Sequence, residues 1–375
     1  MLYAAAAILI IFGFIFPRNK AITVLFLLLY WVLLGFNTYN ADFEAYENIY
    51  AQIGVGNLWG TSVDEEGFIF LMYFCINVLH LTYAGFLLLF STICTALLAV
   101  VSVLYSKNRN IVLGLFLLYS YWVMVVQIRS HLATLLALIG VYFLVYHNDK
   151  KSIALFFGFI LVAIFFHRST VFFLPLCMIR FLDVKRTAII TAICSTVFLA
   201  IRLPFVSSLM GLFLSQEKIN NWLLSDRDRT LFSILMLVMI RVVYLAAVYI
   251  LYKSLNKNNY LFEKMNHVIQ GSSKVTYDIS AERIFKISVL SMSYIALEAF
   301  SKDYERLFRL VIFLSYVIFA DYTCAKRVSM GKIQLSYITY YAFIFVFLGY
   351  FFYVYGGWID IAFRPVFESN SLLGA

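Results

Sequence analysis

Apolar runs about as long as membrane-spanning helices recur along the whole chain and leave it few ways to fold. A helix needs about twenty residues, at 1.5 Å each, to cross a hydrocarbon layer about 30 Å thick. Backbone groups in lipid must be hydrogen-bonded within their own segment, which favours helices. The sequence therefore predicts an all-α transmembrane bundle with about 12–13 spans. The candidate spans are residues 2–17, 21–37, 67–82, 84–105, 110–127, 131–147, 152–167, 169–182, 187–206, 231–252, 284–300, 307–323 and 333–355.

Composition argues against a soluble protein. Hydrophobic residues make up 63% of the 375 residues and charged residues only 13%, with a mean hydropathy of +0.88. Soluble domains have roughly half apolar and a quarter charged residues. The net charge of +9 comes from short connectors between apolar runs, so it does not indicate a nucleic-acid partner. The five cysteines lack metal-ligand spacing and no nucleotide-binding motif occurs, so neither metal nor cofactor is predicted.

The basic connectors predict how the chain is oriented in the membrane. Every second connector in the later part is rich in lysine and arginine, and these should be cytoplasmic. They are Lys107/Arg109, Lys150/Lys151, Lys185/Arg186, residues 253–283 and Lys326/Arg327/Lys332. The outer connectors are then residues 127–130, 167–168, 207–230 and 301–306. Near the N-terminus the number of predicted spans disagrees by one with this orientation, because spans 67–82 and 84–105 would return Lys107 to the outside.

The domain prediction is one membrane domain over residues 1–375 with three notable connectors. Residues 38–66 combine acidic and aromatic side chains at helical spacing, which predicts an amphipathic helix at the outer interface. Either this segment contains a re-entrant piece, or one N-terminal span is miscounted. Residues 207–230 are predicted to form an outer loop and residues 253–283 a polar cytoplasmic loop.

Ionisable residues at the outer helix ends are the candidates for chemistry. A charge at bilayer depth is costly, so such residues usually face a water-filled cavity or a site. Gln127 and Arg129 lie between two spans, and His167 and Arg168 lie between two others. Arginine can hold phosphate through its planar fork of donors, or extend to the lipid headgroups. Histidine can act as a base or simply cap a helix.

Two further groups lie in outer connectors. Asp42, Tyr46 and Tyr50 are spaced four residues apart, so they share one helical face. The last outer connector and the span after it carry a third charged group, whose members either bind a ligand or solvate a turn. These are Glu305, Arg306 and Arg309.

Taken in order, these motifs resemble those of the EpsG-type polysaccharide polymerases, which are Wzy-like enzymes. The resemblance extends over most of the chain. Its motifs are Asp42–x3–Tyr46–x3–Tyr50, Glu65-Glu66-Gly67, Gln127-Ile128-Arg129, Phe166-His167 followed by Ser169, and a late outer arginine. Two positions depart from the usual pattern, since Ser130 replaces a glutamine and Glu66 replaces a proline. The second departure leaves open whether Glu65 or Glu66 is the equivalent acid.

The resemblance implies an architecture and an activity. The architecture would be similar to the GT-C glycosyltransferases. A growing glycan on undecaprenyl diphosphate would be transferred to a new lipid-linked repeat unit at the outer face of the cytoplasmic membrane. The product would be exopolysaccharide, capsule or O-antigen. Membrane lipid, a chain-length regulator and a flippase are the implied partners, and no metal or cofactor is needed.

The resemblance also implies roles for individual residues. Arg129, Arg306 and Arg309 would bind the diphosphates, and His167, Asp42 and Glu66 are the candidate bases. The other residues assigned to substrate binding are Gln127, Arg168, Tyr46, Tyr50 and Glu305.

Two other functions are open to a chain of this kind. A flippase or exporter of lipid-linked sugars usually shows an internal repeat and mid-helix charges, which this sequence lacks. A membrane acyltransferase acting on the glycan would need its base histidine near the cytoplasmic or mid-membrane acyl donor, whereas His167 is predicted to lie outside.

Overall fold

The computed structural model describes residues 2–57, 65–200, 231–256, 277–299, 302–329 and 357–373. These residues are mostly helical and contain no strand; one isolated bridge pairs Asn37 with Asn370. Four helices are long and apolar enough to cross a membrane, and several shorter apolar helices accompany them. The predicted polytopic membrane bundle is therefore confirmed. The four are α5 (Tyr83–Tyr105), α8 (Ile128–Tyr146), α13 (Leu231–Asn256) and α17 (Arg306–Ser329).

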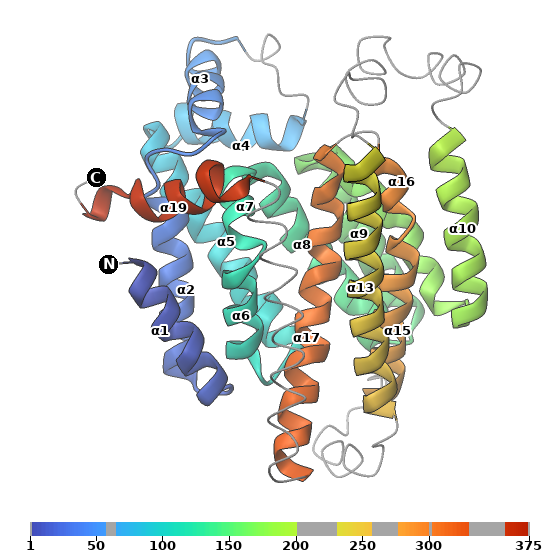
Figure 1. The fold of residues 1–375 in the computed structure, drawn as a ribbon. Coiled ribbons are helices and arrows are strands. Elements are labelled where there is room, and N and C mark those ends of the chain that lie inside the picture. Colours follow the sequence, from blue (N-terminus) through green and yellow to red (C-terminus); the bar gives the residue numbers. More distant parts are fainter. Residues whose placement is uncertain are drawn as a thin grey trace. The chain divides into compact units, whose positions relative to one another are not determined.

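The chain divides into two compact units, shown as a ribbon in Figure 1. The first comprises Met1–Phe143, Lys151–Val171 and Phe319–Ala375, and the second comprises Leu144–Lys150 and Phe172–Ile318. Besides α5 and most of α8, the first unit contains α1 (Leu2–Ile15), α2 (Lys20–Gly35), α3 (Phe43–Gly54), α4 (Glu66–Asn77), α6 (Arg109–Leu118), α7 (Tyr121–Val126), most of α9 (Lys150–Phe166), η4 (Ile359–Phe363), α19 (Arg364–Glu368) and η5 (Ser371–Leu373). The second contains most of η1 (Arg168–Arg180), α10 (Val184–Ala200), α13, α15 (Tyr277–Ser291), α16 (Tyr294–Glu298), η2 (Lys302–Glu305) and the first half of α17.

Helices α1, α2, α5 and α6 pack together in the first unit and connect two opposite ends. Gly13 allows α1 to approach α6 closely, because a Cβ atom at this position would lie 2.7 Å from the Asn110 carbonyl oxygen. One end of the unit carries the basic connectors, where Arg18 donates a hydrogen bond to Asn108 at 2.8 Å. At this end the Asn110 backbone N–H also donates to the Pro17 carbonyl oxygen.

Helix α4 corrects the predicted span 67–82. It has 12 residues, about 18 Å of helix, which is too short to cross the hydrocarbon layer. Its two ends stay at the same end of the unit. Glu65, just before it, contacts Arg129 of α8 and His167, which follows α9, whereas Leu81 after it accepts a hydrogen bond from Tyr50 of α3 at 2.8 Å. Figure 1 shows α4 lying crosswise to α2 and α5.

This arrangement resolves the failed count of N-terminal spans. If α2 leaves the basic end and α5 returns to it, the described residues 38–57 and 65–82 remain on one side, and Lys107 rejoins Arg18. The predicted amphipathic helix is α3, which buries Tyr46, Ile49, Tyr50 and Ile53. Helix α4 and the two residues after it expose apolar side chains that suit a lipid interface, namely Phe70, Tyr73, Phe74, Val78 and Leu79.

Three other predicted boundaries differ from the structure. Span 110–127 is broken into α6 and α7 at Ser120, whose φ of 83° is in the left-handed region that side chains rarely adopt. Span 169–182 is largely the 3-10 helix η1, in which Pro175 cannot donate a backbone hydrogen bond. The predicted loop 253–283 is helical at its ends, since α13 extends to Asn256 and α15 starts at Tyr277. The predicted loop 207–230 and span 333–355 lie outside the described residues.

The C-terminal segment is tied to the end of α2 in the first unit. Asn37 donates hydrogen bonds to the carbonyl oxygens of Pro365 and Ser369, each at 3.2 Å. Asn370 donates in return to the Val32 carbonyl oxygen at 3.0 Å. The ring of Phe367 lies 4.3 Å from that of Trp122 in α7. These contacts fix the connector from which α3 begins.

The second unit contains a fully buried ion pair that the sequence analysis did not identify. Arg241 of α13 donates from Nη2 to both carboxylate oxygens of Glu298 in α16, at 2.9 and 3.2 Å. The side chains are 1% and 0% exposed. The Arg241 guanidinium also lies 3.6 Å from the centroid of the Phe308 ring in α17, a cation–π contact. This pair connects three helices of the unit.

Candidate functional site

Glu65 is the centre of a buried charged cluster in the first unit, at the end opposite the contact of Arg18 with Asn108. One carboxylate oxygen lies 3.0 Å from Nδ1 of His167, and the other accepts a hydrogen bond from Nη1 of Arg129. Nε of Arg129 donates to the Tyr46 hydroxyl at 3.2 Å. The carboxylate at the start of α4 therefore joins α8 to the end of α9, and Tyr46 of α3 joins the cluster through Arg129.

Helix termini position each member of the cluster. Glu65 is the N-cap residue of α4, but its side chain makes no capping hydrogen bond, so both oxygens are directed to His167 and Arg129. His167 follows the last residue of α9, and its backbone N–H donates to Ala163. Arg129 is the second residue of α8. Such helix ends bring charged groups together without placing them at the membrane centre.

Close packing of α4 on α9 brings Glu65 to His167. A Cβ atom at Gly67 would lie 2.3 Å from Cδ1 and 2.8 Å from the carbonyl oxygen of Phe165, so only glycine allows this approach. A second ion pair lies beside the first, between Glu66 and Arg168 at 2.9 Å. Its side chains are 54% and 30% exposed, whereas those of Glu65 and His167 are 8% and 7% exposed. The two neighbouring acids are therefore in different environments.

Glu65 is ionised in this site at neutral pH. It precedes α4, outside the membrane-spanning helices. Burial raises the pKa of its carboxyl, but the hydrogen bond with His167 and the charge of Arg129 outweigh burial and lower the pKa to about 2. An ionised carboxylate only accepts hydrogen bonds, so Nδ1 of His167 must carry a proton.

Hydrogen-bonding capacity remains around the cluster. Nη2 of Arg129 has no partner within the described part of the chain, and the side chain is 24% exposed. The same is true of two buried oxygens, Oε1 of Gln127 and Oγ of Ser169. Buried polar atoms are usually satisfied in folded proteins, so these atoms are candidates for contacts with a ligand.

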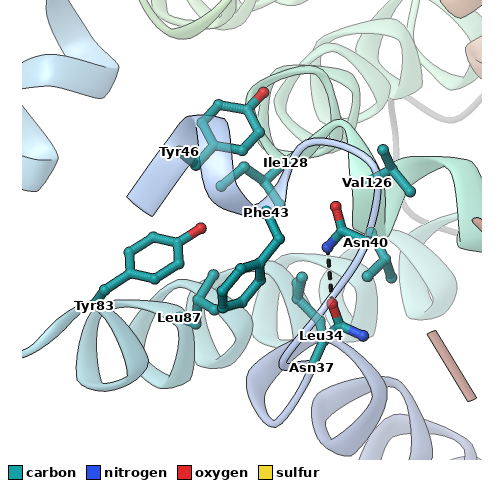
Figure 2. Close-up of a pocket in the computed structure, with 10 residues that line it drawn as sticks. Leu34, Asn37, Asn40, Phe43, Tyr46, Tyr83, Leu87, Val126 and Ile128 are labelled. Carbon is teal, nitrogen blue, oxygen red and sulfur yellow. Dashed lines mark hydrogen bonds between the residues drawn. The ribbon is translucent and has the colours of Figure 1, made fainter. Parts of the chain in front are cut away.

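A small pocket adjoins the cluster through Tyr46. Figure 2 shows it between the connector that leads into α3 and the first turn of α5, with Asn40 donating a hydrogen bond to Asn37 at 2.8 Å. Its interior has room for about one water molecule, which is too small for a sugar ring. Its lining residues are Leu34, Asn37, Asn40, Phe43, Tyr46, Tyr83, Leu87, Val125, Val126 and Ile128.

The structure brings three predicted site residues together around Glu65, namely Arg129, His167 and Tyr46. Tyr50 instead bonds to the Leu81 backbone and is buried among aromatic rings. Asp42 is half-buried at the start of α3, one turn before Tyr46. Gln127 is two residues before Arg129, and Arg168 pairs with Glu66 outside the buried cluster.

The remaining predicted residues belong to the second unit. Glu305 and Arg306 are half-buried where η2 meets α17, and Arg309 is 3% exposed one turn into α17. Glu66 is the predicted candidate base of the two adjacent acids, whereas Glu65 holds the central position in the structure. The start of α4 decides which of the two adjacent acids faces inward, since Glu65 is its N-cap residue with an extended backbone and Glu66 is its first helical residue. Within the described residues, no three His, Cys, Asp or Glu side chains are grouped to hold a metal ion.

Comparison with known proteins identifies the family. Neither the curated proteins nor the solved structures contain a match to this chain. The model of the EpsG family matches residues 20–363, which include every residue of the cluster. This multi-pass membrane protein belongs to the EpsG family.

Proposed function

We propose that the protein is a glycosyltransferase that polymerises oligosaccharide repeat units carried on undecaprenyl diphosphate. It would act at the outer face of the cytoplasmic membrane and build an exopolysaccharide, capsule or O-antigen. The observation that carries this proposal is the cluster of Glu65, Arg129 and His167, in which a buried histidine and an arginine with remaining donors share one carboxylate. Membership of the EpsG family supports the same activity.

Arg129 is assigned to the diphosphate of the donor. The leaving diphosphate is an anion, and Nη2 of Arg129 is a donor on a side chain that solvent reaches. A positioned arginine stabilises negative charge that develops in the transition state. The pairing of Nη1 with Glu65 holds the guanidinium in one orientation, so little freedom is lost when a diphosphate binds.

His167 is assigned as the general base. It takes the proton of an acceptor sugar hydroxyl on Nε2, and the hydroxyl oxygen forms a bond with the anomeric carbon of the donor. The bond from that carbon to the diphosphate oxygen breaks, and the electron pair leaves with the diphosphate. Atoms and charges balance without a metal, a nucleotide or a redox partner. His167 is preferred over Asp42 and Glu66 because it joins the same cluster as Arg129.

The test is polymerisation by the purified protein in liposomes that contain lipid-linked repeat units. We expect a ladder of longer glycans from the native protein. Arg129→Ala should reduce the rate on the order of a hundredfold or more, since a charge-assisted pair is worth a few kcal/mol. Arg129→Lys keeps the charge but loses the planar fork, so it should restore only part of the rate.

The same experiment separates the alternative functions. A flippase would move the lipid-linked unit across the bilayer without lengthening the glycan. An arginine that only reaches lipid headgroups would accept lysine with no loss. No elongation by folded native protein, or native polymer from both Arg129 variants, would overturn the assignment.

A further inference from the structure

The carboxylate of Glu65 touches both proposed reactive groups, His167 as well as Arg129. It lies 3.0 Å from Nδ1 of His167 through one oxygen and bonds Arg129 through the other. Its side chain is only 8% exposed and makes no cap to its own helix. A buried charge is costly unless its environment compensates it. The contacts with His167 and Arg129 compensate the buried charge of Glu65.

We infer that Glu65 is a positioning residue that fixes the tautomer and orientation of His167 as the base and holds Arg129 toward the diphosphate. The inference rests on the proposed function and names a further residue of the same site. Glu65 would not touch the sugar or exchange a proton. It acts through the two side chains that it contacts.

The tautomer follows from the hydrogen bond. A carboxylate oxygen can only accept, so the proton of neutral His167 is on Nδ1 and the lone pair is on Nε2. Nε2 is then the atom that receives the proton of the acceptor hydroxyl. When it does, the imidazolium is stabilised by the negative charge of Glu65, as in hydrolases whose carboxylate orients a catalytic histidine.

The backbone holds this geometry on both sides. The His167 carbonyl oxygen accepts hydrogen bonds from the hydroxyl and the N–H of Thr170, at 2.7 and 3.1 Å. Gly67 lets the start of α4 approach Phe165, which brings the Glu65 carboxylate to the ring. The charged and titratable groups around the histidine are Glu65 and Glu66 at the start of α4, Arg129 on α8, Tyr46 on α3 and Arg168 on η1.

Because one carboxylate serves two groups, its loss should affect two kinetic parameters. Glu65→Gln keeps the size of the side chain but removes its charge and places an amide N–H2 near one partner. We expect kcat to fall on the order of a hundredfold or more and the KM for the donor lipid to rise. Glu65→Asp keeps the charge on a shorter side chain and should recover part of kcat.

The dependence of kcat on pH separates positioning from a merely structural role. The base must be neutral, so the acidic limb of the profile reports protonation of His167. Without the neighbouring negative charge the imidazolium is less stable, so the acidic limb in Glu65→Gln should move to lower pH. A variant that is only less well folded would lose amplitude and keep the profile. Glu47→Gln, at an exposed position on α3, is the matched control.

A second measurement is made on the native protein and does not depend on the folding of Glu65→Gln. Selective ¹⁵N labelling of the five histidines, with His167→Gln to assign the His167 signals, should show a protonated Nδ1 and an unprotonated Nε2 at neutral pH. A protonated Nε2 in the neutral ring would overturn the inference.

The kinetic outcomes are also distinct from failure of the proposed function. Native kcat, KM and pH profile in Glu65→Gln, with loss in His167→Ala and Arg129→Ala, would overturn only the role of Glu65. Loss in Glu66→Gln but not in Glu65→Gln would transfer the role to Glu66. If the His167 and Arg129 variants also kept native activity, the proposed site itself would fail.

Discussion

Two buried ion pairs in the described part of the chain, one in each unit, differ in how much of their arginine remains available. In the second unit, Arg241 gives two hydrogen bonds to Glu298, lies over the Phe308 ring and is 1% exposed. In the first unit, the Arg129 side chain is 24% exposed, and its Nη2 has no partner within the described residues. We interpret the Arg241–Glu298 pair as structural and the Arg129–Glu65 pair as able to bind a ligand.

The comparison shows why a buried charge alone does not identify a site. A guanidinium that bonds a buried carboxylate, is covered by an aromatic ring and is closed off from solvent stabilises the contact between helices. A guanidinium that is held by Glu65 and Tyr46 but still reaches solvent is oriented and has donors left. The predictions below test this difference, beginning with the largest expected change in stability.

Removing Glu298 should be the most damaging change to folding. Glu298→Ala leaves Arg241 buried without its carboxylate, and breaking a buried pair typically costs about 3–5 kcal/mol. Thermal unfolding in detergent and the yield of inserted protein measure this loss. The double variant Arg241→Met/Glu298→Leu removes both charges and should recover most of the stability. If Glu298→Ala unfolded at the same temperature as the native protein, the structural interpretation would be contradicted.

Lowering the pH should remove the stability that the Glu65 cluster contributes, and this loss should be somewhat smaller than that caused by Glu298→Ala. The lowered pKa of Glu65 in the folded state contributes about 3 kcal/mol of stability above pH 4.5. Because the folded pKa is below the unfolded one, this contribution is lost as pH falls from about 4.5 toward 2. Unfolding of the native protein and of Glu65→Gln, followed across this range, should show their difference in stability shrinking. A difference that stays constant with pH would exclude an ionised Glu65.

Widening the contact between α4 and α9 should have the smallest effect on stability but a clear effect on the site. In Gly67→Ala the added methyl group meets Phe165, and overpacking of this kind costs about 1–3 kcal/mol. The carboxylate of Glu65 should move away from His167. Polymer yield per folded protein should therefore fall, in addition to the loss of stability. Gly158→Ala on α9, where a Cβ atom meets nothing within 4 Å, is the control. Full activity in Gly67→Ala would show that close contact is not required.

Local patterns were sufficient for some of these features. The apolar runs predicted helical membrane spans, and the four-residue spacing of Tyr46 and Tyr50 predicted that they share one face of α3, because both depend on periodicity within a segment. They were not sufficient for α4, whose apolar residues resemble a span although the helix lies crosswise. Hydropathy measures affinity for lipid and contains no information on direction.

The sequence by itself determined that this chain is a helical membrane protein, and its motifs indicated its family, because these depend on composition and on order along the chain. Only the tertiary structure decided that Glu65, rather than Glu66, faces Arg129 and His167, residues 64 and 102 positions away. The extended backbone of Glu65 at the N-cap of α4 and the space left by Gly67 select the inward acid. Two adjacent identical side chains cannot be distinguished until the backbone directs one inward and the other to solvent.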